Sequence, residues 1–272
     1  MSGLDRASLV AFHSAFYRPE GSAWVLAGDF EVDAIARRLD DELAGWSGAP
    51  PIRPTPAKPA GLDRPRLVLL DRPGSAQAVI RAGHVGVPRL DPDYHAILIL
   101  NQILGGQFTS RLNATLREEK GLTYGVRSHF DMRRDAGPFY VGASVQTDRV
   151  AEAVAELRAE LEALAFGARP ATAAELEDAR RSLIEGQARH FETPSALVSR
   201  YAGLHLHGLP PDHLAGFADR LLEVEIEGLT SVASRRIHPD RLAIVVVADA
   251  ESVAEPLRRL GWGPIDLIDD RA

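Results

Sequence analysis

Prolines divide the chain into a short segment and a long one. Half of the positions from 50 to 59 are proline, namely Pro50, Pro51, Pro54, Pro56 and Pro59. Proline fixes φ and lacks an N–H donor, so such a run neither continues a helix nor lies inside a sheet. We therefore predict an extended linker over residues 48–65. It separates residues 1–47 from residues 66–272, and the second segment is long enough to bury a core.

Strand and helix patterns alternate along the long segment. Apolar runs typical of strands cover residues 66–70, 76–84, 122–131, 138–146 and 242–247. Helical spacing of apolar residues covers residues 91–104, 147–166, 195–207, a stretch after Pro211 and the residues that follow the last strand. A capping box, Thr172-Ala173-Ala174-Glu175, opens a further helix. The pattern predicts an α+β domain with a mostly antiparallel sheet and helices packed on one face.

The short segment resembles the end of the long one. Residues 8–17 and 32–46 have helical spacing, and residues 23–27 form an apolar run typical of a buried strand. Tyr17-Arg18-Pro19, strand, Ala27-Gly28-Asp29 recurs as Ile237-His238-Pro239, strand, Val247-Ala248-Asp249, with ten residues from proline to aspartate in both copies. We interpret residues 1–47 as the terminal helix–strand–helix of a preceding homologous domain, and residues 66–272 as a complete domain. The alternative is chance similarity between two short segments.

The composition excludes several classes of function. A formal net charge of −7 disfavours nucleic acid, which needs a basic face. The absence of cysteine excludes disulfides, thiolate zinc sites and a cysteine nucleophile. The sequence has no apolar run of the ~20 residues that a membrane span needs. Residues 1–6 lack the basic and apolar regions of a signal peptide, so we expect a cytoplasmic protein.

One block of sequence combines a loop, a helix and a strand in a fixed spacing. It runs from Leu104-Gly105-Gly106 through Phe108-Thr109-Ser110-Arg111 and Leu116-Arg117-Glu118 to Gly121-Leu122-Thr123-Tyr124. The glycine pair is typical of a helix end with a left-handed residue. Thr109 or Ser110 is a candidate cap for the next helix, which Gly121 ends before a strand begins at Leu122.

This block resembles the signature of the second, zinc-free half of pitrilysin/insulinase-type metallopeptidases. Gln77 in Ser75-Ala76-Gln77 and the Asp93-Tyr94 pair are also similar to that family. The resemblance implies two α/β halves of the processing-peptidase kind, which close like a clamshell around an extended peptide. It implies that Arg117 and Tyr124, seven residues apart, reach the substrate at a zinc site in the other half. We further expect substrate contacts from Gly105, Gly106, Phe108, Ser110, Arg111 and His129.

Elementary chemistry agrees with the roles implied for Arg117 and Tyr124. The tetrahedral transition state of peptide hydrolysis carries negative charge on the former carbonyl oxygen, and a guanidinium and a phenol hydroxyl can stabilise it. The structural alternative is that Arg117 pairs with Glu118 or another acid while Tyr124 belongs to the core.

The sequence predicts no zinc site in this chain. A catalytic zinc needs about three protein ligands, and none of the nine histidines has another histidine four residues away. The only local cluster is His205-Leu206-His207 with Asp212 and His213, which we interpret as a solvated helix end. We therefore expect no cofactor here and zinc in a partner half that carries His-x-x-Glu-His.

Two functions from different classes follow. The first is the non-zinc half of a metallopeptidase, which completes the peptide cleft, assists a zinc-bearing homologous half and is inactive alone. The second is a catalytically silent scaffold or peptide-binding subunit of a larger assembly. The resemblance also allows a homodimer, or a fragment without separate activity.

Overall fold

The protein is described by a computed structural model that covers residues 3–51 and 55–269. Its residue contacts define two compact units, Met1–Lys58 with Ala188–Pro211, and Pro59–Gln187 with Asp212–Ala272. The boundary after Lys58 falls inside the predicted linker, whose described parts contain neither helix nor strand; its residues 52–54 lie outside the described residues. This clustering groups residues 188–211 with residues 1–58, and the single domain over residues 66–272 stays a prediction.

The first unit consists of helices and extended chain. It contains α1 (Arg6–Phe16), α2 (Val32–Leu43) and α7 (Pro194–His207), together with a short 3₁₀ turn, η4 (Arg189–Phe191). The Thr193 hydroxyl accepts the Ala196 N–H at 3.2 Å and caps α7, and left-handed Gly208 ends it. The strand expected at residues 23–27 is not formed. A strand needs a neighbour for its backbone groups, and none of the described residues of this unit forms a strand beside it.

The second unit is built on a mixed, mostly antiparallel sheet. Its strands are β1 (Arg66–Asp71), β2 (Gln77–Val85), β3 (Thr123–Phe130), β4 (Pro138–Gln146), β5 (Ala243–Ala248) and β6 (Ile265–Asp269). The order across the described sheet is β3-β4-β2-β5-β1-β6. The pairs β3–β4, β2–β4 and β2–β5 are antiparallel, whereas β1 lies parallel to both β5 and β6. Strand β6, which the sequence analysis missed, is the edge strand beside β1.

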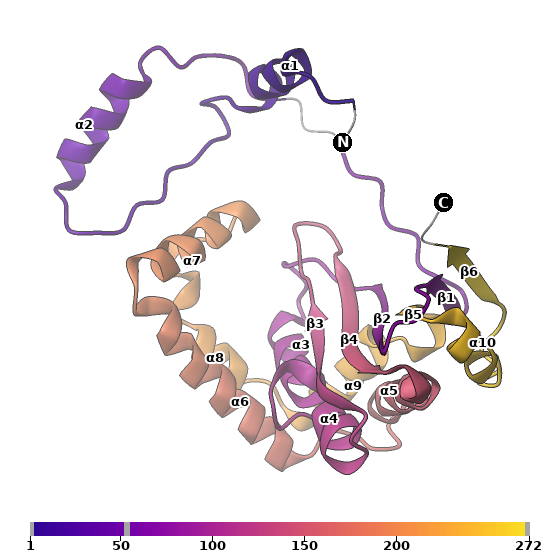
Figure 1. The fold of residues 1–272 in the computed structure, drawn as a ribbon. Coiled ribbons are helices and arrows are strands. Elements are labelled where there is room, and N and C mark those ends of the chain that lie inside the picture. The colour runs from indigo at the N-terminus through magenta and orange to yellow at the C-terminus, as the bar shows by residue number, and fades with distance from the viewer. Residues whose placement is uncertain (1–2, 52–54, 270–272) are drawn as a thin grey trace. The chain divides into compact units, whose positions relative to one another are not determined.

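Helices cover one face of this sheet, as Figure 1 shows. They are α3 (Tyr94–Asn101), α4 (Arg111–Asn113), α5 (Val150–Ala165), α6 (Ala173–Ala188), α8 (Phe217–Leu222), α9 (Ile226–Arg236) and α10 (Ala250–Arg258). Short 3₁₀ or π-helical turns lie between the helices and strands: η1 (Gln102–Gly106), η2 (Ala114–Glu119), η3 (Thr147–Arg149), η5 (Pro211–Leu214) and η6 (Pro239–Arg241). The predicted fold class is confirmed.

The core follows from the two-residue period of the strands. Alternate residues such as Leu69, Ile80 and Phe139 are fully buried on the helix side. There α5 contacts β2 and β4, and α10 contacts β1. Residues of opposite parity, such as Val79 and Val245, stay partly exposed on the face without helices. Burial on one face fixes the register, because a one-residue slip would turn the apolar set to solvent.

His84, near the end of β2, is a half-buried histidine in its neutral form. Its Nε2 accepts the His238 backbone N–H at 3.1 Å, so Nδ1 carries the proton and donates to the Val85 carbonyl at 2.9 Å. Burial is the main cause that lowers the pKa of His84 to about 4.

We predict that the protein loses stability as the pH falls, because of His84. In the unfolded chain His84 has an ordinary pKa near 6.5 and binds a proton below that pH, whereas in the folded protein it binds one only near pH 4. The contribution is therefore complete above about pH 6.5 and is lost as the pH falls through this window, by at most about 3 kcal/mol. Urea unfolding at about pH 7.5 and about pH 4.5 should show a smaller loss for His84→Gln than for the wild type.

The matched control removes an exposed histidine on β3, His129→Gln, and the two variants are compared at the same two pH values. Equal losses in His84→Gln and the wild type would contradict the assignment.

Candidate functional site

Tyr124 lies on a β-bulge in the edge strand β3. Thr123 pairs with Val145 and Val126 pairs with Ala143, so Tyr124 and Gly125 together occupy the place opposite Ser144. A bulge adds one residue to one strand and changes the direction of its side chain. Tyr124 is accordingly 94% exposed, in a strand whose neighbouring apolar residues are buried.

The Thr123 hydroxyl satisfies the backbone of the bulge. It accepts the Gly125 N–H at 3.2 Å and lies 2.7 Å from the Ser144 carbonyl oxygen and 2.9 Å from that of Gly125. One hydroxyl proton serves these two carbonyls, so the side chain replaces ladder bonds that the extra residue displaces.

Asn113 fixes the strand to the short helix that precedes it. Its side chain is 5% exposed, and its Oδ1 accepts the Val126 N–H at 3.2 Å while its Nδ2 donates to the Val126 carbonyl at 3.0 Å. Nδ2 also lies 3.0 Å from Ser110 Oγ and 3.1 Å from the Gln107 carbonyl. One buried carboxamide thus holds the loop before α4, the start of α4 and the strand after the bulge in one arrangement.

Arg117, on η2, has no acidic partner. Its guanidinium carbon lies 4.1 Å from the centroid of the Phe108 ring, a cation–π contact. No ion pair of Arg117 exists within residues 3–51 and 55–269. Because Tyr124 is also exposed, the alternative of a paired Arg117 and a core Tyr124 is wrong for both residues.

Arg117 and Tyr124 both line two adjoining hollows. One cavity, of about 250 Å³, is lined mainly by the loop before α4, with Gly105, Gly106 and Phe108, and by β3. The other, of about 380 Å³, is lined by Gln77 and by the facing parts of β3 and β4. Arg117 and Tyr124 therefore lie between these two cavities, at the edge strand β3.

The two glycines have a different role from the predicted one. Neither Gly105 nor Gly106 has a positive φ; both lie in the π-helical turn η1 at the end of α3. A Cβ on Gly105 would lie 2.7 Å from the backbone nitrogen of Ser128. Gly105 lacks a side chain where η1 packs directly on β3, whereas a Cβ on Gly106 would lie close to the side chains of Gln102 and Asn101. Gly121, with φ +60°, ends η2 before β3, as the sequence predicts, and it is the residue of this block with a left-handed conformation.

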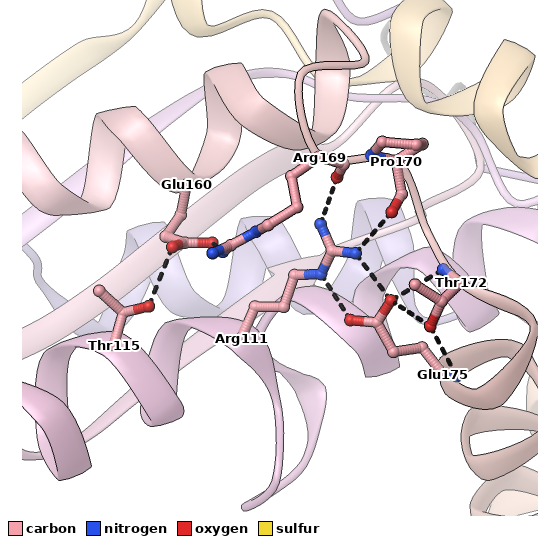
Figure 2. A network of polar contacts seen from close by, with 7 residues as sticks. All are labelled: Arg111, Thr115, Glu160, Arg169, Pro170, Thr172 and Glu175. Atoms are coloured by element: carbon pink, nitrogen blue, oxygen red, sulfur yellow. Dashed lines mark hydrogen bonds and ion pairs between the residues drawn. The ribbon is translucent and has the colours of Figure 1, made fainter.

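Ser110 and Arg111 face the interior, away from both hollows. Arg111 is 8% exposed and makes a bidentate ion pair with Glu175, with Nε–Oε1 2.6 Å and Nη2–Oε2 2.7 Å. It also donates to the carbonyls of Arg169 at 2.5 Å and Pro170 at 2.8 Å, as Figure 2 shows. These two residues were expected to contact substrate; the structure instead gives them partners inside the protein.

Glu175 links Arg111 to the capping box of α6. The Thr172 N–H donates to Glu175 Oε2 at 2.8 Å, and the Glu175 N–H donates to Thr172 Oγ1 at 3.2 Å, which confirms the predicted box. Burial alone would raise the pKa of the Glu175 carboxyl, but hydrogen bonds from Arg111 and Thr172 outweigh it and hold this pKa below its ordinary value. A neighbouring contact in Figure 2 joins buried Glu160 to Arg169 and to the Thr115 hydroxyl.

The remaining predicted site residue lies apart from this group. His129 is exposed on β3, with its ring 5.6 Å from that of Tyr140, and it lines neither hollow. A larger cavity, of about 640 Å³, lies at the helix-free face beside Arg81 and Tyr140 and includes neither Arg117 nor Tyr124.

Sequence reasoning missed Asn113 and Thr123, which hold the site together. No spacing rule predicts a buried asparagine that binds a strand thirteen residues away. An isolated glycine within a strand pattern does indicate a bulge, and Gly125 was such a signal.

The described residues hold no group of three or more His, Cys, Asp or Glu side chains that could bind a metal ion. His213 lies against Arg89, with Nε2 3.4 Å from Nη2. Zinc in a partner half stays a prediction. Among the helices that the structure describes, none is long and apolar enough to cross a bilayer.

The chain belongs to the Peptidase M16 inactive domain family, whose model matches residues 3–183. This confirms the resemblance drawn from the sequence. An uncharacterized zinc protease of Mycobacterium tuberculosis H37Rv is 27% identical over 236 residues, which are 86% of this chain and 53% of that protein. The chain thus spans about half the length of this relative.

Solved structures share the fold. The peptidase M16 inactive domain from Pseudomonas fluorescens superposes with a TM-score of 0.81 at 25% identity, covering 90% of this chain and 57% of that one. A protease from Helicobacter pylori gives a TM-score of 0.79 at 19% identity, covering 90% and 60%.

We predict that Arg111 contributes stability. Arg111→Met leaves the Glu175 carboxylate and two carbonyl oxygens without their buried donor, and should lower the free energy of unfolding by about 3 kcal/mol or more. Chemical denaturation measures it. Arg134→Met, at an exposed arginine, should stay within about 0.5 kcal/mol of the wild type; equal stability of the two variants would contradict a structural role for Arg111.

Proposed function

We propose that this chain is the non-zinc half of a pitrilysin/insulinase-type metallopeptidase. It completes the peptide-binding cleft and presents Arg117 and Tyr124 to the transition state at zinc in a homologous half. The observation that carries this proposal is the pair itself, an arginine without an acidic partner and an exposed tyrosine at the meeting of two hollows.

Arg117 and Tyr124 would act by electrostatic stabilisation of the transition state. Water attack on a peptide carbonyl places negative charge on its oxygen, and donors that are already oriented stabilise that charge without reorganisation. The Arg117 guanidinium carbon lies over the Phe108 ring, and this contact does not require its N–H groups as hydrogen-bond donors. The Tyr124 hydroxyl makes no hydrogen bond within the described parts of the chain, so it is free to donate. Zinc in the other half would supply the activated water.

The first unit supports a homologous partner. Leu9, Phe12 and Trp24 are exposed, and neither α1 nor α2 has a buried residue. An apolar surface of this kind is typical of a contact with another protein element. We propose that it belongs to the domain of which residues 1–47 are the terminal part. The relatives of greater length are named zinc proteases, which fits a zinc-bearing half of the same family.

The test is complementation. The chain is mixed with a homologous half that carries His-x-x-Glu-His, and cleavage of a quenched peptide is followed. We predict that Arg117→Gln and Tyr124→Phe each lower kcat/KM by about a hundredfold or more, with peptide affinity retained. Arg134→Gln, matched in charge change, should leave kcat/KM unaltered.

Two outcomes would contradict the proposal. Cleavage by the metal-loaded chain alone would mean that this half carries its own catalytic site. Unchanged turnover in the double variant of Arg117 and Tyr124 would instead indicate a silent scaffold or peptide-binding subunit. The cytoplasmic location and the homodimer stay predictions that this assay does not address.

A further inference from the structure

The hollow beside Phe108 has an uneven charge. Its lining includes two arginines, Arg117 and Arg127, and no acidic residue. The chain as a whole is acidic, with a formal net charge of −7, so this local excess of positive charge is not a property of the general surface.

Neither arginine is neutralised nearby. In the described chain Arg127 makes no ion pair or side-chain hydrogen bond, and Arg117 contacts only the Phe108 ring. The other cation of this region, Lys120, is bound to Glu156 with Nζ–Oε1 2.6 Å. Glu118 and Glu119, on the same turn as Arg117, do not line the hollow.

The hollow is built before any ligand arrives. The Asn113 carboxamide fixes the loop at Gln107 and the strand at Val126, and both of these line the space. The close packing of Gly105 on β3 sets its floor. Phe108 and Tyr124, both exposed, add aromatic walls. At about 250 Å³ it is smaller than a typical small-molecule pocket, and it is of a size for one amino-acid side chain.

We propose that this hollow is a specificity subsite for an acidic side chain of the peptide, one residue of glutamate or aspartate next to the scissile bond. A carboxylate accepts two parallel N–H bonds from a guanidinium, and Arg127 is the residue assigned to it, since Arg117 serves the scissile carbonyl. The second hollow shares Arg117 and Tyr124 with the first, and its other polar lining residues include uncharged Gln77, Ser144 and Gln146. The position beside the scissile bond rests on the proposed function, whereas the preference for an acid does not.

The experiment measures peptide binding by the full chain. Fluorescein-labelled extended peptides of alanine and serine carry one glutamate, moved through the central positions one at a time, and each has a matched glutamine peptide. Fluorescence anisotropy gives Kd for every pair. At one position the glutamate peptide should bind about tenfold more tightly, and added salt should weaken the preference.

Variants assign the preference to its residue. Arg127→Gln should reduce the ratio to less than about twofold, and Arg127→Lys should restore part of it because the charge is kept while the bidentate geometry is lost. Arg134→Gln should keep the wild-type ratio. Equal binding of glutamate and glutamine peptides at every position, or no binding of either, would overturn the subsite, as would a preference that survives Arg127→Gln.

The binding and turnover experiments test the subsite and the proposed function independently of each other. Loss of turnover in Arg117 and Tyr124 variants without any preference for acid overturns the subsite alone. A preference lost in Arg127→Gln, with turnover indifferent to Arg117 and Tyr124, supports the subsite and overturns the catalytic role.

Discussion

The side chain of Asn113 is the contact on which the site depends. It bonds both backbone groups of Val126, in a strand that would otherwise be joined to the sheet only through β4. The same amide holds the loop that carries Phe108. An edge strand with a bulge is free to twist or slip, and a buried partner on its open side removes that freedom. The position of the turn that carries Arg117 relative to the strand that carries Tyr124 therefore depends on a contact in the interior.

The sequence block from Leu104 to Tyr124 contains buried residues that bind other parts of the protein and residues that are accessible to solvent. Ser110, Arg111 and Asn113 are buried and bonded, whereas Phe108, Arg117 and Tyr124 are at least partly accessible. The buried residues join the short helix α4 to its neighbours. Arg111 binds Glu175 of α6, and Asn113 binds Val126 of β3, while η2 follows α4 directly along the chain. This explains why one motif can be specific without every member contacting substrate. Its spacing encodes a scaffold as much as a set of reacting groups.

Much of the fold could be predicted from the sequence, because burial of one face gives strands and helices a regular spacing of apolar residues. The strands at β1, β2, β3, β4 and β5, the Gly121 helix end and the Thr172–Glu175 box all follow local rules, and all are formed. The failures have one cause, since each depends on a neighbour that sequence does not name. The apolar run at 23–27 has no strand beside it in the described part of its unit. Strand β6 pairs with β1, about two hundred residues earlier in the chain. Gly105 is a glycine because the Ser128 backbone lies close to it. For the site, sequence supplied Arg117 and Tyr124 but not the bulge that exposes the tyrosine, because a bulge is defined by the register of two strands.

The assignment of α7 to the first unit changes how the two units are connected. The chain passes from one unit to the other after Lys58, again after Gln187, and a third time after Pro211. A protease that cuts only in the proline-rich segment therefore separates the N-terminal part of the first unit from the chain, but leaves residues 188–211 joined to the second unit through the two remaining passages. An expression boundary drawn at that segment would likewise keep α7 while removing the residues with which it clusters. The proline-rich segment is a linker in composition, and it holds one of the three boundaries between the two units.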